Sequence, residues 1–131
     1  MINDLKDRTK RFAVDVVRFC STLNAKPEYR IISKQLVRAG TSVGANYRAA
    51  CRSKSKADFI NKLSIVEEEA DESEYRFELL ESLAAAKSPE LVRLKDEAHQ
   101  LVAIMIQSKK TARTSLATAQ TRDLQFEIRN S

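Results

Sequence analysis

The sequence predicts an all-α protein folded as a four-helix bundle, and three observations lead to this. Its 131 residues include only two glycines and two prolines, whereas turn-rich β architectures need many more turn-forming residues. Ala, Leu, Glu, Lys and Arg dominate, and these residues lose little conformational entropy in a helix. Apolar residues recur every three or four positions along four segments, which is the spacing of one buried helix face. The length suits one domain with one core.

Asn24 and Pro27 separate the first two predicted helices. The first helix runs from about Asp4 to Leu23, and the second begins near Pro27, which suits a first helical turn, and runs to about Arg52. The predicted core stripe of the first helix is Leu5, Phe12, Val16, Phe19 and Leu23. The apolar face of the second is Ile32, Leu36, Ala39, Val43, Asn46, Tyr47 and Ala50.

The third and fourth predicted helices each begin after a serine. Ser55, followed three residues later by Asp58, resembles a capping box, and Ser88-Pro89 is typical of an N-cap followed by a first-turn proline. The third helix has a near-heptad stripe, which favours bundle-like packing: Phe59, Leu63, Val66, Ala70, Ser73, Phe77, Leu80 and Ala84. The fourth carries Leu91, Leu94, Ala98, Leu101 and Met105 and is predicted to end near Arg113.

Two domain regions follow from this pattern. Residues 1–113 form the predicted bundle. Residues 114–131 are polar with weak periodicity, and we expect this tail to be frayed or ordered only against a neighbouring subunit.

Gly40 and Gly44 lie one turn apart within the second helix. Glycine costs about 1 kcal/mol in a helix interior relative to alanine, so a pair of them favours a flat patch where another backbone approaches closely. That contact lies within the bundle or between subunits; the alternative is that both glycines are tolerated by chance. Asn46 is on the apolar face, and we expect its amide to be satisfied by a buried hydrogen bond.

Charge is segregated along the chain. Residues 26–62 hold nine Lys or Arg and two acids, a net charge of +7, and residues 63–81 hold eight acids and one arginine, a net charge of −7. Glu69 and Glu72 lie beside apolar residues, so we expect them to pair with basic residues at a helix or subunit contact. The basic stripe of the second helix is the candidate contact for RNA or DNA, with a solvated face or salt-bridge partners as the alternatives: Lys34, Arg38, Arg48 and Arg52.

The pattern argues against catalysis and against a metal or other cofactor. A di-metal bundle needs two Glu-x-x-His pairs, and His99 is the single histidine. That lone histidine forms no recognisable triad, and Cys20 and Cys51 lie in apolar helical patterns that favour burial as reduced thiols. No phosphate-binding glycine loop is present, and no small-molecule substrate is evident. We therefore predict that the protein is not an enzyme.

No apolar run reaches the roughly 20 residues of a membrane span, and the first seven residues show no signal-peptide core. We expect a cytoplasmic protein without a membrane partner.

The central residues are similar to a known family. The run from Gln35 to Arg48 resembles the central motif of a bacterial four-helix-bundle family, also called the intervening-sequence protein family of large-subunit ribosomal RNA. The match continues downstream at Ser55, Asp58, Phe59, Ile60, Lys62, Leu63, Ile65, Glu69, Glu72, Ser73 and Tyr75. The chain departs from the family pattern at Ala49, Glu68 and Arg76, changes that alter surface contacts and not the core stripe.

The resemblance implies an antiparallel up-and-down bundle that assembles into a ring-shaped homopentamer. Related accessory variability determinant proteins form basic pentameric barrels that bind nucleic acid and a reverse transcriptase. The family's ribosomal label reflects gene location and implies no ribosomal role.

From the residues and the resemblance together we expect a non-catalytic, homo-oligomeric binding or scaffold module. The alternative is a nucleic-acid-binding accessory protein that uses a basic face of the oligomer. The residues expected at helix or subunit packing contacts are Gly40, Gly44, Asn46, Glu69, Glu72 and Tyr75.

Overall fold

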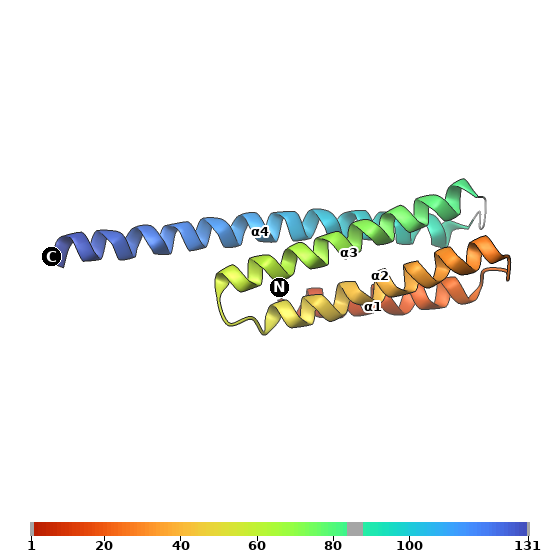
Figure 1. The fold of residues 1–131 in the computed structure, drawn as a ribbon, viewed down its shortest axis with the longest axis horizontal. Coiled ribbons are helices and arrows are strands. Elements are labelled where there is room, and N and C mark those ends of the chain that lie inside the picture. The colour runs from red at the N-terminus through yellow and green to blue at the C-terminus, as the bar shows by residue number, and fades with distance from the viewer. Residues whose placement is uncertain (1, 84–87, 131) are drawn as a thin grey trace.

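The computed structural model describes residues 2–83 and 88–130, which form four α-helices. These are α1 (Ile2–Ser21), α2 (Pro27–Cys51), α3 (Lys56–Ser82) and α4 (Pro89–Asn130). Each helix runs antiparallel to the one before it, so the chain goes up and down the bundle (Figure 1). The predicted all-α four-helix bundle is confirmed for the described residues. The predicted core position Ala84 lies outside them.

The helices begin where local chemistry places their first turns. Pro27 occupies the first turn of α2, where its missing N–H leaves no hydrogen bond unmade. The backbone N–H of Asp58 donates to Ser55 Oγ at 3.1 Å, so Ser55 caps α3. The backbone N–H of Leu91 donates to Ser88 Oγ at 3.2 Å at the start of α4. Both serine caps are as predicted.

The core is a continuous apolar seam contributed by all four helices. Of the predicted stripe positions, Leu5, Leu23, Ile32 and Phe59 are only partly buried and pack against the cluster from its edges. Phe19 and Phe77 meet across the core with ring centroids 5.7 Å apart. The largest fully buried side chains are Phe12, Phe77, Leu36, Leu63, Leu80, Leu91, Leu94, Leu101, Met105, Val16, Val43 and Val66.

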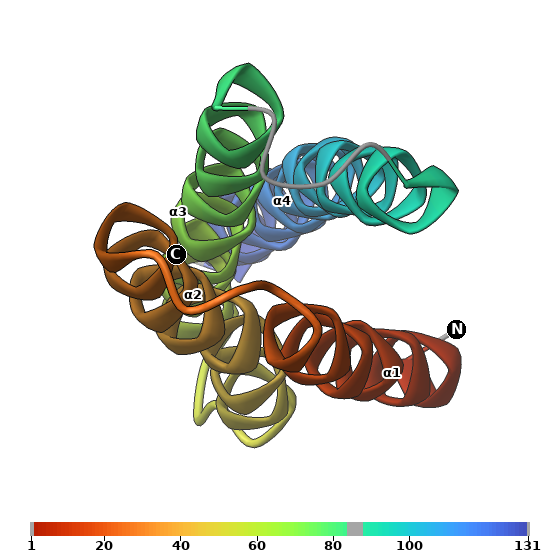
Figure 2. The ribbon, with the colours of Figure 1, turned by 90° about the vertical axis from the view of Figure 1, so that its right-hand side faces the viewer.

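The bundle is closed unevenly. Seen end-on in Figure 2, α2 and α3 lie at the centre of an arc, with α1 beside α2 and α4 beside α3. α1 and α4 have the least extensive contact of the neighbouring pairs, and two ion pairs join them. Arg8 bonds to Glu97 through two hydrogen bonds of 2.8 and 2.7 Å, and Arg93 Nη2 lies 3.0 Å from Asp15 Oδ2.

The end of α4 corrects the sequence analysis. The helix does not stop near Arg113 but continues to Asn130, well past the other three helices (Figure 1). Weak apolar periodicity does not predict fraying, because periodicity indicates which face of a helix is buried and not whether the backbone is helical. We call residues 113–130 the overhang; nearly all of its side chains are exposed. No described helix is long and apolar enough to span a membrane.

Candidate assembly and binding surfaces

The two glycines of α2 lie against α1 inside the subunit, and both are buried. A Cβ at Gly44 would lie 3.3 Å from the Thr9 carbonyl oxygen, so the two backbones approach closely there. A Cβ at Gly40 would lie 3.0 Å from Cγ1 of Val16. The structure therefore places this close helix contact between α1 and α2.

Asn46 makes a simpler contact than expected. Its Nδ2 donates to the Ser42 carbonyl at 2.8 Å, one turn earlier in the same helix, and the side chain is only partly buried. The Asn46 amide N–H is therefore hydrogen-bonded within α2 and does not bridge two helices.

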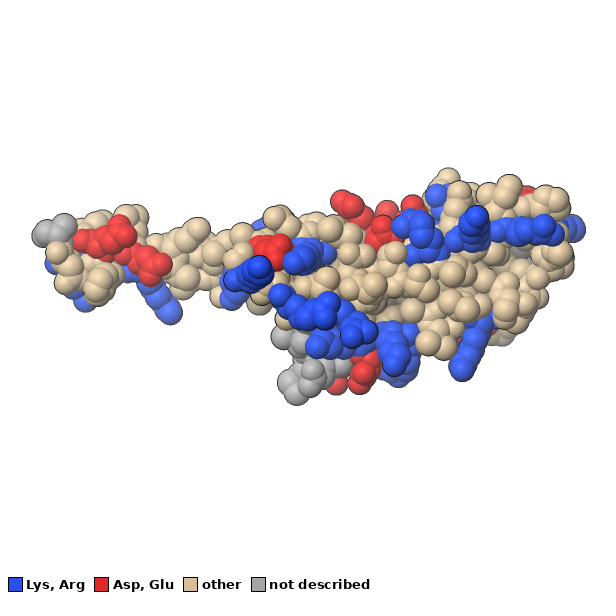
Figure 3. Space-filling model, turned by 60° about the horizontal axis from the view of Figure 1, so that its bottom comes forward, with Lys and Arg blue, Asp and Glu red and all other residues tan. Residues whose placement is uncertain are grey.

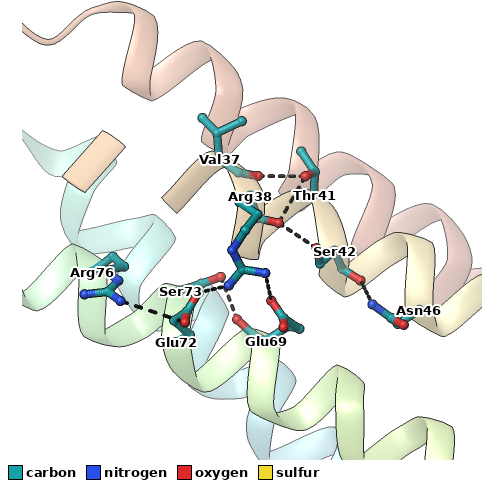
Figure 4. A network of polar contacts seen from close by, with 9 residues as sticks. All are labelled: Val37, Arg38, Thr41, Ser42, Asn46, Glu69, Glu72, Ser73 and Arg76. Atoms are coloured by element: carbon teal, nitrogen blue, oxygen red, sulfur yellow. Dashed lines mark hydrogen bonds and ion pairs between the residues drawn. The ribbon is translucent and has the colours of Figure 1, made fainter. Parts of the chain in front are cut away.

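The opposite side of α2 meets α3 through charge. Arg38 reaches across to α3, where its Nη1 lies 3.2 Å from Glu69 Oε2 and its Nη2 pairs with Glu72 (Figure 4). Arg76 Nη2 lies 3.8 Å from the other oxygen of Glu72. We call these four residues the Arg38 network. The pairing raises the pKa of Arg38, because Glu69 and then Glu72 stabilise its positive charge.

The Arg38 network joins two predicted groups. Glu69 and Glu72 do find a basic partner on α2, and that partner is one of the four residues expected to contact nucleic acid. Arg38 is 54% exposed, whereas Glu69 and Glu72 are 20% and 32% exposed. The guanidinium therefore lies over carboxylates that are already half-buried.

Apolar side chains lie exposed along the same face of α3. Ile65, Tyr75 and Leu83 are 43%, 51% and 46% exposed. At 100° per residue Ile65 and Tyr75 lie on the side of α3 that carries Glu72, and Leu83, the C-cap residue just after Ser82, follows the end of that side. The Tyr75 ring also stacks with the Arg76 guanidinium, whose Cζ is 5.3 Å from the ring centroid. We call Ile65, Tyr75, Leu83 and the Arg38 network the α2–α3 face.

A basic groove of about 520 Å³ lies between α1 and α2. Lys6, Lys10 and Arg48 line it together with the acidic Asp7, and its floor includes Gly44. None of these three cations forms an ion pair among the described residues. Figure 3 shows many Lys and Arg side chains, and fewer acids, on the side of the molecule toward α1. Lys34 is exposed elsewhere on α2, and Arg52 is exposed at the C-cap just after it; neither lines the groove.

Sequence reasoning missed the two α1 lysines in this groove. Lys6 and Lys10 lie one turn apart, which was the available signal, but nothing in the local sequence tells which side of α1 turns toward α2. Only the glycine contact, which sets how α1 lies on α2, brings them to Arg48.

The reactive side chains lie apart. His99 Nδ1 is 3.0 Å from Glu74 Oε2 on the α3–α4 side. Burial raises the pKa of Cys20 to about 11, which keeps its thiol protonated and weakly nucleophilic near neutral pH. Burial, and then the neighbouring Cys51, raise the pKa of Tyr47. Among the described residues, no group of three or more His, Cys, Asp or Glu could hold a metal ion.

Comparison with known proteins agrees with this architecture. The described helices are similar to the crystal structure, at 1.70 Å resolution, of a protein of unknown function from the S23 ribosomal protein family of Bacteroides thetaiotaomicron. The two chains are 36% identical with a TM-score of 0.76, over 83% of this chain and 97% of that one. A search of curated proteins found no match. The 23S rRNA-intervening sequence protein family matches residues 3–107, and the chain belongs to that family.

Proposed function

We propose that this protein is a non-catalytic, homo-oligomeric binding or scaffold module whose subunits assemble through the α2–α3 face. The observation that carries the proposal is the row of exposed apolar side chains, Ile65, Tyr75 and Leu83, beside the Arg38 network. A ring-shaped homopentamer is the assembly that the family resemblance implies.

The chemistry of the α2–α3 face suits a protein contact. Aromatic residues and arginine are enriched at protein interfaces, and this face offers Tyr75, Arg38 and Arg76 together. The ion pairs already hold Arg38 across the helix pair, so less side-chain entropy would be lost when another subunit covers it. Burying these exposed apolar side chains against a neighbouring subunit would stabilise the assembly.

The absence of catalysis is part of the proposal and has its own support. The Cys20 thiol is held protonated by burial, and His99 pairs with the Glu74 carboxylate. The half-buried carboxylates Glu69, Glu72 and Glu97 pair with arginines of another helix.

Light scattering of the purified chain tests the assembly. We expect the wild-type assembly to have a mass of five subunits or a multiple of that mass. Ile65→Asp should lower the mass, because a carboxylate would have to be buried at the contact. Val92→Asp is the matched control, since Val92 is 56% exposed on α4, away from this face. A monomeric wild-type protein, or an Ile65→Asp variant with unchanged mass and circular dichroism, would contradict the proposal.

A second candidate function is nucleic-acid binding, and the basic groove favours it. Lys6, Lys10 and Arg48 have no acidic partners among the described residues, so they are free to neutralise phosphates. An oligomer would repeat the groove once per subunit and so extend the cationic surface.

Salt titration separates this candidate from a scaffold without nucleic acid. Binding of a duplex or a single strand through about six phosphates should weaken by about 10³ between 50 and 200 mM salt. Lys10→Glu with Arg48→Glu should abolish it, whereas Lys110→Glu with Arg113→Glu on α4 makes the same charge change outside the groove. Equal loss in both double variants would show that net charge alone, and not the groove, binds the strand.

A further inference from the structure

We propose that the α4 overhang docks antiparallel against the overhang of a second copy of this chain, with Phe126 of each copy seated in an apolar groove of the other. This goes beyond the proposed function, because it uses a different surface and does not depend on the α2–α3 face.

The overhang lacks support from the rest of its own subunit. It continues α4 for 18 residues past the last buried position, Ala112, a length of about 27 Å. A free helix of that length is marginal in water, and Thr114, Thr118 and Thr121 lower its helix propensity further. Leu124, Phe126 and Ile128 nevertheless lie 57%, 68% and 67% exposed. A neighbour that covers the side of the overhang carrying Phe126 would account for the helicity of the overhang and for this exposed ring; Leu124 and Ile128 lie about 160° around the helix from Phe126 and are not part of the proposed contact.

The spacing of the buried seam of α4 continues into the overhang. Inside the bundle the seam is Leu91, Leu94, Ala98, Leu101 and Met105, with spacings of three and four. The same alternation continues through Ser108, Ala112, Ser115, Ala119, Arg122 and Phe126. Large residues give way to small ones where the bundle ends, so a second helix could approach this stripe closely.

An apolar groove lies at the root of the overhang. It has a volume of about 510 Å³, and Leu5, Tyr47, Phe59, Ile104 and Ala112 contribute its apolar lining. Phe126 of the same chain cannot reach it, because the straight helix carries this residue 14 positions, about 21 Å, beyond Ala112. The chain therefore carries an apolar groove and an exposed ring that cannot meet within one copy.

One register satisfies all three features. If a two-fold axis passes beside Ala119, residues equally far from it on either side face each other across the helix pair. Phe126 then lies opposite Ala112 in the groove of the second copy. Asp123 lies opposite Ser115, whose hydroxyl accepts a hydrogen bond of 2.7 Å from Lys56, so a carboxylate meets an ammonium group. The two small Ala119 side chains meet at the axis.

A second copy of this chain, not another protein, is the occupant that fits. The groove residue Ala112 and Phe126 are 14 residues apart on the same side of α4, so a single two-fold axis midway between them brings each ring to the groove of the other copy. The overhang lies beyond residues 3–107, the part of the chain that the family shares, so this contact would belong to this protein and not to the family as a whole.

Disulfide trapping tests the register in the full-length chain. Ala119→Cys should form a disulfide-linked dimer under mild oxidation, because the two cysteines would meet at the axis. Ala117→Cys is the matched control: it is also an exposed alanine, but about 160° around the helix from Ala119. We expect at least about a tenfold higher yield from Ala119→Cys. Equal yields, or no dimer from either variant, would overturn the proposed pairing. Cys20 and Cys51 are present in both variants and do not affect the comparison.

Light scattering separates this proposal from the assembly through α3. Phe126→Asp should halve the mass, whereas Gln125→Asp, on another side of the overhang, should not change it. Phe126 lies outside the core, so circular dichroism should show an intact bundle. If only the overhang contact exists, a wild-type dimer becomes a monomer in Phe126→Asp. If only the α2–α3 face assembles, Phe126→Asp keeps the wild-type mass while Ile65→Asp lowers it, which would overturn the present inference alone.

Discussion

Helix α2 contacts its two neighbours by different means. Toward α1 it presents Gly40 and Gly44, and the backbones approach so closely that a Cβ at Gly44 would lie 3.3 Å from the Thr9 carbonyl oxygen. Toward α3 it extends Arg38, which pairs with Glu69 and Glu72 at a half-exposed surface. The α1–α2 contact depends on the close fit of two backbones. The α2–α3 contact shares the apolar core, and at its exposed edge it adds ion pairs, which solvent screens and other charged residues can replace.

Gly44→Leu should disrupt the α1–α2 contact and cause the largest loss of stability among the substitutions proposed for these contacts. The new side chain meets backbone, which cannot rotate away, so we expect a loss of about 3 kcal/mol of unfolding free energy. Chemical denaturation measures it. Ala45→Leu, at the exposed neighbouring position, should change stability by less than about 0.5 kcal/mol. Equal effects of the two substitutions would mean that the close approach at Gly44 is unimportant.

High pH should weaken the same contact through Cys20, whose Sγ lies 3.9 Å from the Ser33 carbonyl of α2. Burial raises the pKa of this thiol from 9.0 to about 11 in the folded chain. The buried, protonated thiol therefore contributes fully to the free energy of unfolding below pH 9. This contribution, about 2 kcal/mol, is lost as the pH rises through 11. Between pH 8 and 11, wild-type protein should lose more stability than Cys20→Ala. Parallel pH curves for the two proteins would contradict this.

A double-mutant cycle sharpens the comparison inside the α1–α2 contact. The three nearest atoms to a Cβ at Gly40 all belong to Val16, whereas those nearest Gly44 are backbone atoms of α1. Gly40→Ala and Val16→Ala should therefore couple by about 1 kcal/mol, because the smaller Val16 replacement makes room. Gly44→Ala should show no coupling with Val16→Ala, and a similar coupling energy there would refute the assignment.

The α2–α3 contact should show the smallest effect. Replacing Glu69 and Glu72 by Gln should lower the folding equilibrium constant at most about fivefold, since exposed ion pairs contribute little. The difference should vanish in 1 M salt, where the screening length is about 3 Å, as urea denaturation can show. This is the effect expected within one subunit; a further loss that depends on protein concentration is what the proposed assembly through the α2–α3 face adds.

The site could be predicted in part. The acidic pair on α3 and its basic partner on α2 were both identified, because carboxylates beside apolar residues need a counter-charge. The choice of Arg38 over Lys34, Arg48 and Arg52 could not be made, since it depends on how far α2 is rotated relative to α3. Tyr75 was expected at a packing contact, and within one subunit it lies half-exposed on α3; its place in an assembly stays a prediction.

The sequence by itself determined the four helices, their serine caps and proline starts, and the seam that each buries, because these depend on neighbours within one or two turns of the same segment. Only the tertiary structure decided that the glycines of α2 face α1, that Lys6 and Lys10 meet Arg48, and that the seam of α4 runs on past its neighbours. Those features depend on the rotation and offset of whole helices, which the packing of the entire core sets and no local pattern records.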